Sequence, residues 1–320
     1  MLLRELLVDR IAHLKNLSAR SVELYGHTLD RFRDFLDREP TIDDLDDLVV
    51  SKFLRDRATQ HNHRQGKISP ASVAKDSAQL RTIWNWCAKK RMKRSNGDLL
   101  EFPDYRRPLV PKPRPVAYTH QDLQTLIEAA RHRKGMVGRV PACWYWPTKL
   151  AAMYETGERI GAILAIRWGE VDLERRTLTF LAATRKGHRE TITRQISPGL
   201  ARMMAPQQGA SDELVWPWTD TRHIMSAYGS LRVLCRVAGV KYHPFHSIRK
   251  STASYMKAAG ASAQKQLGHS GGEGMCETHY YDERITGVES ALDYLPPLDL
   301  GPGRQPPPAA DDSPGDRPAA

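Results

Sequence analysis

Apolar side chains recur at intervals of three and four positions through the first hundred residues, and no run there alternates with a period of two. This spacing is typical of helices that bury one face. In the segment 18–36 the repeat consists of Val22, Tyr25, Leu29, Phe32 and Leu36. Ser18 precedes it and is predicted to be the N-cap. The opening, MLLRELLVDRIAHL, mixes charges with its apolar positions, which predicts an amphipathic helix and not a signal peptide.

Two further helices are predicted from their cap residues. Thr41 precedes a segment whose apolar face would contain Leu45, Leu48, Val49 and Phe53. Ser69, followed by Pro70 at the first helical position, precedes a face of Val73, Ser77, Leu80, Trp84 and Cys87. This last helix continues into KKRMKR, residues 89–94. Two interpretations stay open for these cations. They either lie in solvent and interact favourably with the dipole at the helix C-terminus, or they contact DNA.

The pattern changes at residues 106–118, which contain four prolines and four arginine or lysine residues. We expect an extended, basic linker there. Thr119 then caps a new helix, and two more are predicted on either side of Gly157. β-Branched residues between 171 and 197 predict a small antiparallel sheet with Lys186 at a hairpin. Helices return near Asp220, and residues 298–320, rich in Pro, Gly, Ala and Asp, are expected to be a disordered tail.

Composition adds a partner to this outline. The chain has 320 residues, enough for two domains, and carries 48 Lys and Arg against 37 Asp and Glu, a net charge of +11. A basic excess favours a nucleic-acid partner, with an ordinary basic protein as the alternative. No apolar run reaches the length of a membrane span. Four cysteines without paired spacing are typical of reduced thiols, so we expect a cytoplasmic protein.

Several polar side chains of the second half lie where buried helices would favour apolar ones. Arg159 directly precedes an apolar run, and His246 and Arg249 lie three positions apart, on one helix face. The whole set is Arg159, Lys186, His246, Arg249 and His269. Such cations repel one another unless an anion joins them, and guanidinium groups match the oxygens of a phosphate.

A tyrosine would convert this phosphate site into a reactive one. THYYDER offers two, Tyr280 and Tyr281. A phenol can attack the phosphate while arginines neutralise the transition state and a lysine or histidine protonates the departing alkoxide. The cations take the part of a metal clamp, so no metal or other cofactor is predicted.

These motifs, in this order, resemble the tyrosine recombinases, the phage-integrase family of DNA strand transferases. They are TGERIGAILAIRW, the lysine hairpin, HxxR, and LGHS followed by a tyrosine. The resemblance implies a mainly α fold with a small antiparallel β-sheet (α+β). Its parts would be a helical, SAM-like core-binding domain at 1–105, the linker, a catalytic domain at 119–297 and the tail.

The resemblance also implies partners and an activity. The partner would be double-stranded DNA, bound by a dimer at each core site and by a tetramer in the synapse. The activity would be site-specific recombination or integration for a mobile element, without metal or ATP. No membrane partner is expected. Because the chain starts almost at the first core-binding helix, a separate arm-type DNA-binding domain is expected to be absent.

The resemblance assigns roles to individual residues. Arg159 and Arg249 would hold the scissile phosphate, and Lys186 would be the general acid for the 5′ oxygen. His246 would act as a base or phosphate ligand, and His269 would donate to a non-bridging oxygen. The products of the first step would be a 3′-phosphotyrosine and a free 5′ hydroxyl.

The nucleophile is predicted to be Tyr280, because the family's frequent His-Tyr pair aligns with His279 and Tyr280. Tyr281 remains the alternative, since adjacent residues on a helix point about 100° apart and only one can face the phosphate. The glycine-rich insertion at 271–274 lengthens the preceding loop. The chain departs from the family at Ala162, where relatives commonly carry an acidic residue, so the partner that would hold Arg159 in place is either missing or comes from elsewhere in the chain.

Other interpretations stay open. A type IB topoisomerase uses nearly the same residues to relax supercoils, and an inactive relative would only bind DNA. A zinc-stabilised, non-catalytic DNA-binding module could use His243, His246, Cys276 and His279 as ligands. Finally, residues 288–295 carry one apolar stripe on two helical turns, which would dock on their own domain or, as we favour, on a neighbouring protomer.

Overall fold

The computed structural model describes residues 1–61, 66–111, 113–185, 190–217, 223–267, 276–277 and 279–286. The chain divides into two compact units, Met1–Pro113 and Arg114–Ala320, and each has its own apolar core. The division falls inside the basic, proline-rich stretch 106–118. The predicted terminal helix at 288–295 and the tail lie outside the described residues.

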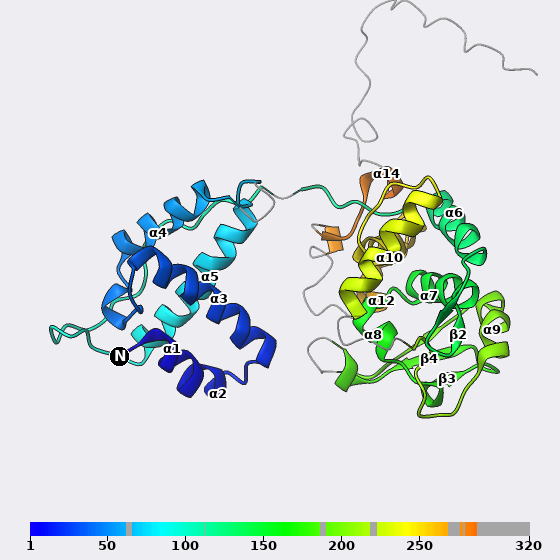
Figure 1. Ribbon diagram of the computed structural model, residues 1–320, viewed down its shortest axis with the longest axis horizontal. Coiled ribbons are helices and arrows are strands. Elements are labelled where there is room, and N and C mark those ends of the chain that lie inside the picture. Colours follow the sequence, from blue (N-terminus) through cyan, green and yellow to red (C-terminus); the bar gives the residue numbers. More distant parts are fainter. Residues whose placement is uncertain are drawn as a thin grey trace, which may run out of the picture. The chain divides into compact units, whose positions relative to one another are not determined.

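Unit 1 is built from helices (Figure 1). Their bounds are α1 Leu3–Leu6, a π-helical turn Leu7–Ile11, α2 Ala12–Leu14, α3 Ala19–Leu36, a 3₁₀ turn Ile42–Asp44, α4 Asp47–Thr59 and α5 Pro70–Lys89. Two caps lie where the sequence predicts them, because the Ser18 and Ser69 side chains accept from backbone N–H groups in the first turns of α3 and α5. The helical bundle predicted for this part of the chain is confirmed.

The start of α4 corrects one prediction. Thr41 caps only the short 3₁₀ turn, and α4 begins six residues later, with Asp46 accepting from the N–H groups of Leu48 and Val49. The later start turns Leu48 away from the core, and it is 62% exposed. The predicted apolar face is therefore wrong at Leu48, because the break in the helix changes which positions align.

One buried carboxylate joins the three long helices of unit 1. Asp76 of α5 is fully buried and accepts from the Thr28 hydroxyl of α3 at 2.8 Å. Its two oxygens also accept from Arg31 and from Arg57 of α4, each at 3.1 Å. Within KKRMKR, Arg94 donates to the backbone oxygens of Asp43 and Leu45. This cation therefore serves the packing of unit 1.

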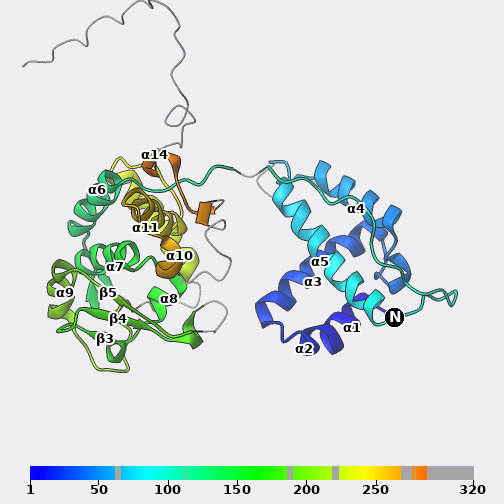
Figure 2. The same ribbon diagram turned by 180° about the vertical axis from the view of Figure 1, so that it is seen from behind.

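Unit 2 combines helices with small sheets, as Figures 1 and 2 show from opposite sides. Its helices are α6 His120–Arg131, α7 Ala142–Thr156, α8 Ile160–Ala165, α9 Pro198–Met204, α10 His223–Val237, α11 His246–Ala258, α12 Ala263–Leu267 and α14 Glu283–Thr286. Its strands are β1 Met136–Val137, β2 Val140–Pro141, β3 Val171–Asp172, β4 Thr177–Phe180 and β5 Ile192–Gln195.

The predicted antiparallel sheet is formed by β3, β4 and β5 in that order. Phe180 pairs with Ile192 at the end of the β4–β5 ladder, so residues 181–191 connect these strands. A second pair, β1 with β2, was not predicted because its strands have two residues each. The fold class expected from the sequence, mainly α with small antiparallel sheets, is confirmed.

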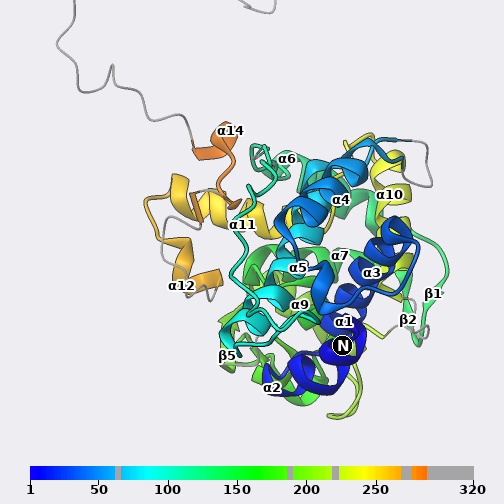
Figure 3. The ribbon, with the colours of Figure 1, turned by 90° about the vertical axis from the view of Figure 1, so that its left-hand side faces the viewer.

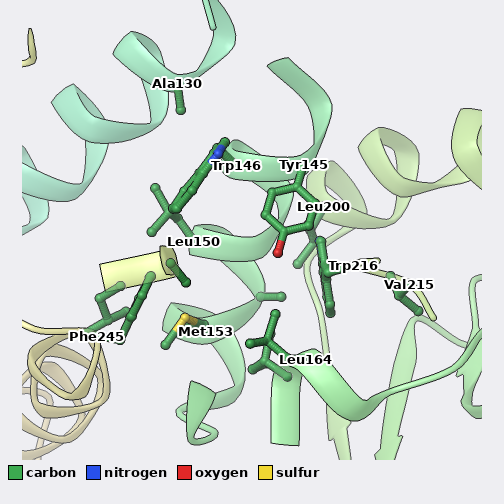
Figure 4. Packing of buried hydrophobic residues seen from close by; sticks show 14 of the residues in the cluster. Ala130, Tyr145, Trp146, Leu150, Met153, Leu164, Leu200, Val215, Trp216 and Phe245 are labelled. Carbon is green, nitrogen blue, oxygen red and sulfur yellow. The ribbon is translucent and has the colours of Figure 1, made fainter. Parts of the chain in front are cut away.

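The core of unit 2 is organised around α7 (Figure 4). Trp146, Leu150 and Met153 of this helix are buried, and Trp146 stacks on Phe245 with ring centres 6.4 Å apart. Thr119 caps α6 as predicted, and Asp122 completes a capping box with it. No helix in the described part of the chain is both long and apolar enough to cross a membrane.

Candidate active site

The turn between α7 and α8 begins the site. Gly157 ends α7 with a φ of +67°, a conformation that L side chains rarely adopt. A Cβ there would also lie 3.0 Å from Leu267 and 3.2 Å from Thr252. The chain then extends through Glu158 to Arg159, which is the half-buried N-cap residue of α8. Arg159 thus lies at the start of a buried helix, as predicted.

Helix α11 carries the predicted His246 and Arg249. The Arg249 side chain is fully buried, and it donates to the backbone oxygen of Gly157 at 2.5 Å and to that of Leu267 at 2.6 Å. Since Gly157 is two residues before Arg159, these bonds connect the helix bearing HxxR to the turn bearing the other arginine. Figure 3 shows α11 with α12 and α14 beside it.

A buried carboxylate balances part of the positive charge. Glu158 is 1% exposed, accepts from Arg185 at 3.0 Å and lies 4.0 Å from Arg249. The pKa of Arg249 is lowered by burial and by the charge of Arg159, while Tyr280 and Glu158 act in the opposite direction. Repulsion of this kind favours the binding of an anion between the arginines.

Arg194 of β5 adds to the same positive field. Burial lowers the pKa of Arg194, the charge of Glu158 raises it and the charge of Arg185 lowers it. Arg185, Arg194 and Arg249 therefore interact with Glu158, and Arg159 interacts with Arg249. The site can hold a phosphate with a net positive charge remaining.

The two adjacent tyrosines face different groups. The Tyr280 ring meets His246 edge-on with ring centres 5.3 Å apart, and the Arg249 guanidinium carbon lies 5.7 Å from the centre of the same ring. The Tyr281 ring instead lies 5.6 Å from the Lys257 ammonium. Both rings are buried, with 6% and 7% exposed. Tyr280 therefore lies against both HxxR residues.

Two predicted site residues, Lys186 and His269, lie outside the described residues. The four candidate zinc ligands are all described, yet no three His, Cys, Asp or Glu side chains of the described part form a metal-binding group. Cys276 instead packs in an apolar cluster with Ala253, Leu267 and both tyrosines. The zinc module is therefore not supported by the positions of these residues.

Sequence reasoning missed the buried acids of the site. Glu158 lies inside TGERIG, next to the predicted Arg159, but a Glu in a polar turn carries no signal of burial. Ala162, where the resemblance led us to expect an acidic residue, is 3% exposed and packs in the core of unit 2. The carboxylate near the arginines comes from Glu158, on the other side of Arg159 in the sequence. Asp282, two residues after Tyr280, is also buried and was not singled out.

Fold and site together define a class of protein. It is an α+β domain in which a tyrosine lies against the His and Arg of an HxxR motif on α11, and this helix is hydrogen-bonded to the turn that precedes a second arginine, Arg159. Residues 117–284, just over half of the chain, match the family model described as "Phage integrase family". The chain belongs to the phage integrase family.

Individual relatives are more distant. The chain is 23% identical over 221 residues to the putative tyrosine recombinase XerC of Pseudomonas aeruginosa, a match covering 65% of this chain. The match spans about half (49%) of that relative's length.

Among solved structures, the fold is similar to the XerH site-specific recombinase bound to palindromic difH substrate, with a TM-score of 0.64 and 14% identity over 88% of this chain and 80% of that one. It is also similar to a lambda integrase dimer bound to a COC′ core site, with a TM-score of 0.59 and 17% identity over 86% and 97% of the two chains. At these identities the likeness concerns the fold.

Proposed function

We propose that the protein is a site-specific tyrosine recombinase that cuts and rejoins DNA strands through a 3′-phosphotyrosine intermediate, without metal or ATP. The observation that carries this proposal is the Tyr280 ring against His246 and the buried Arg249, whose pKa is also lowered by the charge of the half-buried Arg159. A phenol beside two groups that hold phosphate is the arrangement that nucleophilic cleavage of a phosphodiester needs.

The chemistry balances with these residues. The Tyr280 oxygen bonds to phosphorus and gives up its proton to His246 or to water, while the bond from phosphorus to the 5′ oxygen breaks. Arg159 and Arg249 neutralise the charge on the pentacoordinate phosphorus, and Lys186 gives the leaving oxygen its proton. His269 donates to a non-bridging oxygen. Attack by a 5′ hydroxyl from another duplex reverses these steps and restores the phosphodiester.

Partners follow from the same proposal. The solved relatives include a lambda integrase dimer on a core site and a lambda integrase tetramer bound to a Holliday junction. For this chain we propose double-stranded DNA as partner, with dimers on single sites and tetramers in the synapse. Unit 1 would be the core-binding domain and unit 2 the catalytic domain, and the segment 288–295 would dock on a neighbouring protomer.

The direct test is formation of a covalent protein–DNA adduct. A duplex that the full chain selects from a randomised DNA pool would be nicked near the cleavage position, so that the released strand diffuses away. We expect a denaturant-stable adduct in the presence of EDTA, and none with Tyr280→Phe, which should bind DNA normally. An intact adduct with Tyr280→Phe and its loss with Tyr281→Phe would assign the nucleophile to the neighbouring residue. Relaxed but never recombined products would indicate a topoisomerase.

A further inference from the structure

A buried carboxylate lies two residues past Tyr280. Asp282 is 2% exposed, and its side chain accepts from the backbone N–H of Ala117 at 2.7 Å. It also pairs with the Arg284 guanidinium at 2.7 Å, and Arg284 in turn donates to the Ala117 oxygen at 2.9 Å. Both polar backbone atoms of Ala117 are therefore bound by the segment that follows the tyrosine.

The same segment is held on its other side by α11. The Ser254 hydroxyl accepts from the backbone N–H of Asp282 at 2.8 Å and donates to the backbone oxygen of Tyr280 at 3.3 Å. Ser254 is fully buried and belongs to the helix that carries His246 and Arg249. The backbone on both sides of Tyr281 is thus tied to the HxxR helix.

The chain entering unit 2 is fixed to that helix as well. The Tyr118 hydroxyl accepts from the backbone N–H of His243 at 2.8 Å. The backbone oxygen of Tyr118 accepts from the Ser251 hydroxyl at 2.7 Å. Residues 117 and 118 therefore touch both segments that bear the proposed catalytic groups. Tyr118 thus contacts α11 and the segment just before its start, and the adjacent Ala117 contacts the tyrosine segment.

We infer that Asp282 is a positioning residue for the nucleophile: its carboxylate fixes the tyrosine segment to Ala117, while Ser254 fixes the backbone of the same segment to α11. Together these bonds would hold Tyr280 against His246 and Arg249. This inference rests on the proposed function. Holding a nucleophile in place lowers the barrier to its attack, and a misplacement of about 1 Å can cost about 10²-fold in rate. Asp282 itself touches no reacting atom in this scheme.

A positioning role should affect the rates of adduct formation and of rejoining unequally. Before cleavage the tyrosine is held only by the protein, so losing Asp282 leaves it in many orientations that must be restricted before attack. After cleavage the covalent bond to phosphate fixes the tyrosine, and this restriction is already in place. Removing Asp282 should therefore slow adduct formation and leave the rejoining step almost unchanged. A group that stabilises the transition state would affect both directions equally.

The experiment compares Asp282→Ala and Ser254→Ala with the matched control Asp212→Ala, an exposed position in unit 2. Single-turnover adduct formation would be measured on the selected, nicked duplex, and rejoining on the isolated adduct after addition of a strand with a 5′ hydroxyl. DNA affinity and thermal unfolding would be recorded for every variant. We expect adduct formation to fall about 10- to 100-fold for Asp282→Ala and less for Ser254→Ala. Rejoining, affinity and the control should stay near wild type.

Three results would overturn the inference: unchanged adduct formation, equal slowing of both directions, or a loss that follows lowered DNA affinity and melting temperature. If Asp282→Ala does not fold, the same comparison of adduct formation with rejoining in Ser254→Ala decides. The proposed function has a separate outcome, because it fails if the wild-type protein forms no adduct. A wild-type adduct together with unaltered variants would refute the positioning role alone.

Discussion

Lys186 provides a residue-scale test of the proposed proton transfer. Lys186→Ala should cleave normal DNA far more slowly, by about 10²- to 10⁴-fold, the usual contribution of a general acid. A substrate with sulfur in place of the 5′ leaving oxygen needs no proton donor, so its cleavage by this variant should recover. Arg249→Ala should be impaired on both substrates, because its charge acts on the phosphorus oxygens. Equal defects of Lys186→Ala on both substrates would show that Lys186 only binds phosphate.

Lys149 of α7 affects stability at the residue scale. It is fully buried, with its ammonium 3.7 Å from the Trp146 ring centre and 4.3 Å from that of Tyr145. Burial, with the charge of Arg133, lowers the pKa of Lys149 well below its usual value. Between the lowered pKa and the normal value near 10.4, the unfolded chain binds more protons than the folded one. The free energy of unfolding should therefore rise with pH through that window.

Lys149→Met should remove this pH dependence and stabilise the protein at pH 7 by on the order of 1 kcal/mol or more. Urea unfolding at several pH values would measure it, with the exposed Lys134→Met as the control. The aromatic contacts favour the charged ammonium by up to about 2 kcal/mol. A stability curve unaffected by Lys149→Met would contradict this prediction and would mean that these contacts offset the cost of burial.

At the scale of single elements, Asp76 should decide the stability of unit 1. It accepts hydrogen bonds from α3 and α4 while fully buried, and removing it would leave Arg57, itself 9% exposed, without that partner. Asp76→Ala should destabilise unit 1 by about 3–5 kcal/mol, the cost of breaking a buried ion pair. The exposed Asp34→Ala is the control, and its effect should be small. Equal thermal unfolding of both variants would contradict the role of Asp76.

The elements also show what the sequence could and could not predict. Ser18, Ser69 and Thr119 were correct as caps because an N-cap acts on N–H groups within its own turn. The prediction that Leu48 faces the core was wrong. Two nearby polar residues, Thr41 and Asp46, can each act as an N-cap, and the sequence alone does not show which of them begins α4.

The candidate site also contains residues that the sequence indicates and residues that it does not. Motif spacing singled out Arg159, His246 and Arg249 as candidates, and the structure places the Tyr280 ring beside the last two. The buried partners Glu158 and Asp282 were missed because their burial depends on segments distant in sequence. Asp282 contacts Ala117, 165 positions away, and no local pattern reports such a contact.

At the scale of the whole molecule, the net charge of +11 predicts a strong salt dependence of DNA binding. Each phosphate neutralised by Lys or Arg releases counterions, so a protein with 6–10 such contacts loses about 10³- to 10⁵-fold in affinity between 50 and 200 mM salt. Fluorescence anisotropy on the selected duplex would measure the slope. Affinity that stays constant over this range would contradict binding through the phosphate backbone.

The proposed reaction depends on a single covalent bond, between Tyr280 and a DNA 3′ phosphate. Trapping the wild-type adduct with EDTA present, digesting both components and sequencing the modified peptide by mass spectrometry tests this bond most directly. We expect a nucleotide on Tyr280, joined through its 3′ phosphate, and a free 5′ hydroxyl on the other strand end. A modification on Tyr281 or any other residue, a 5′ linkage, or cleavage without a covalent adduct would contradict it.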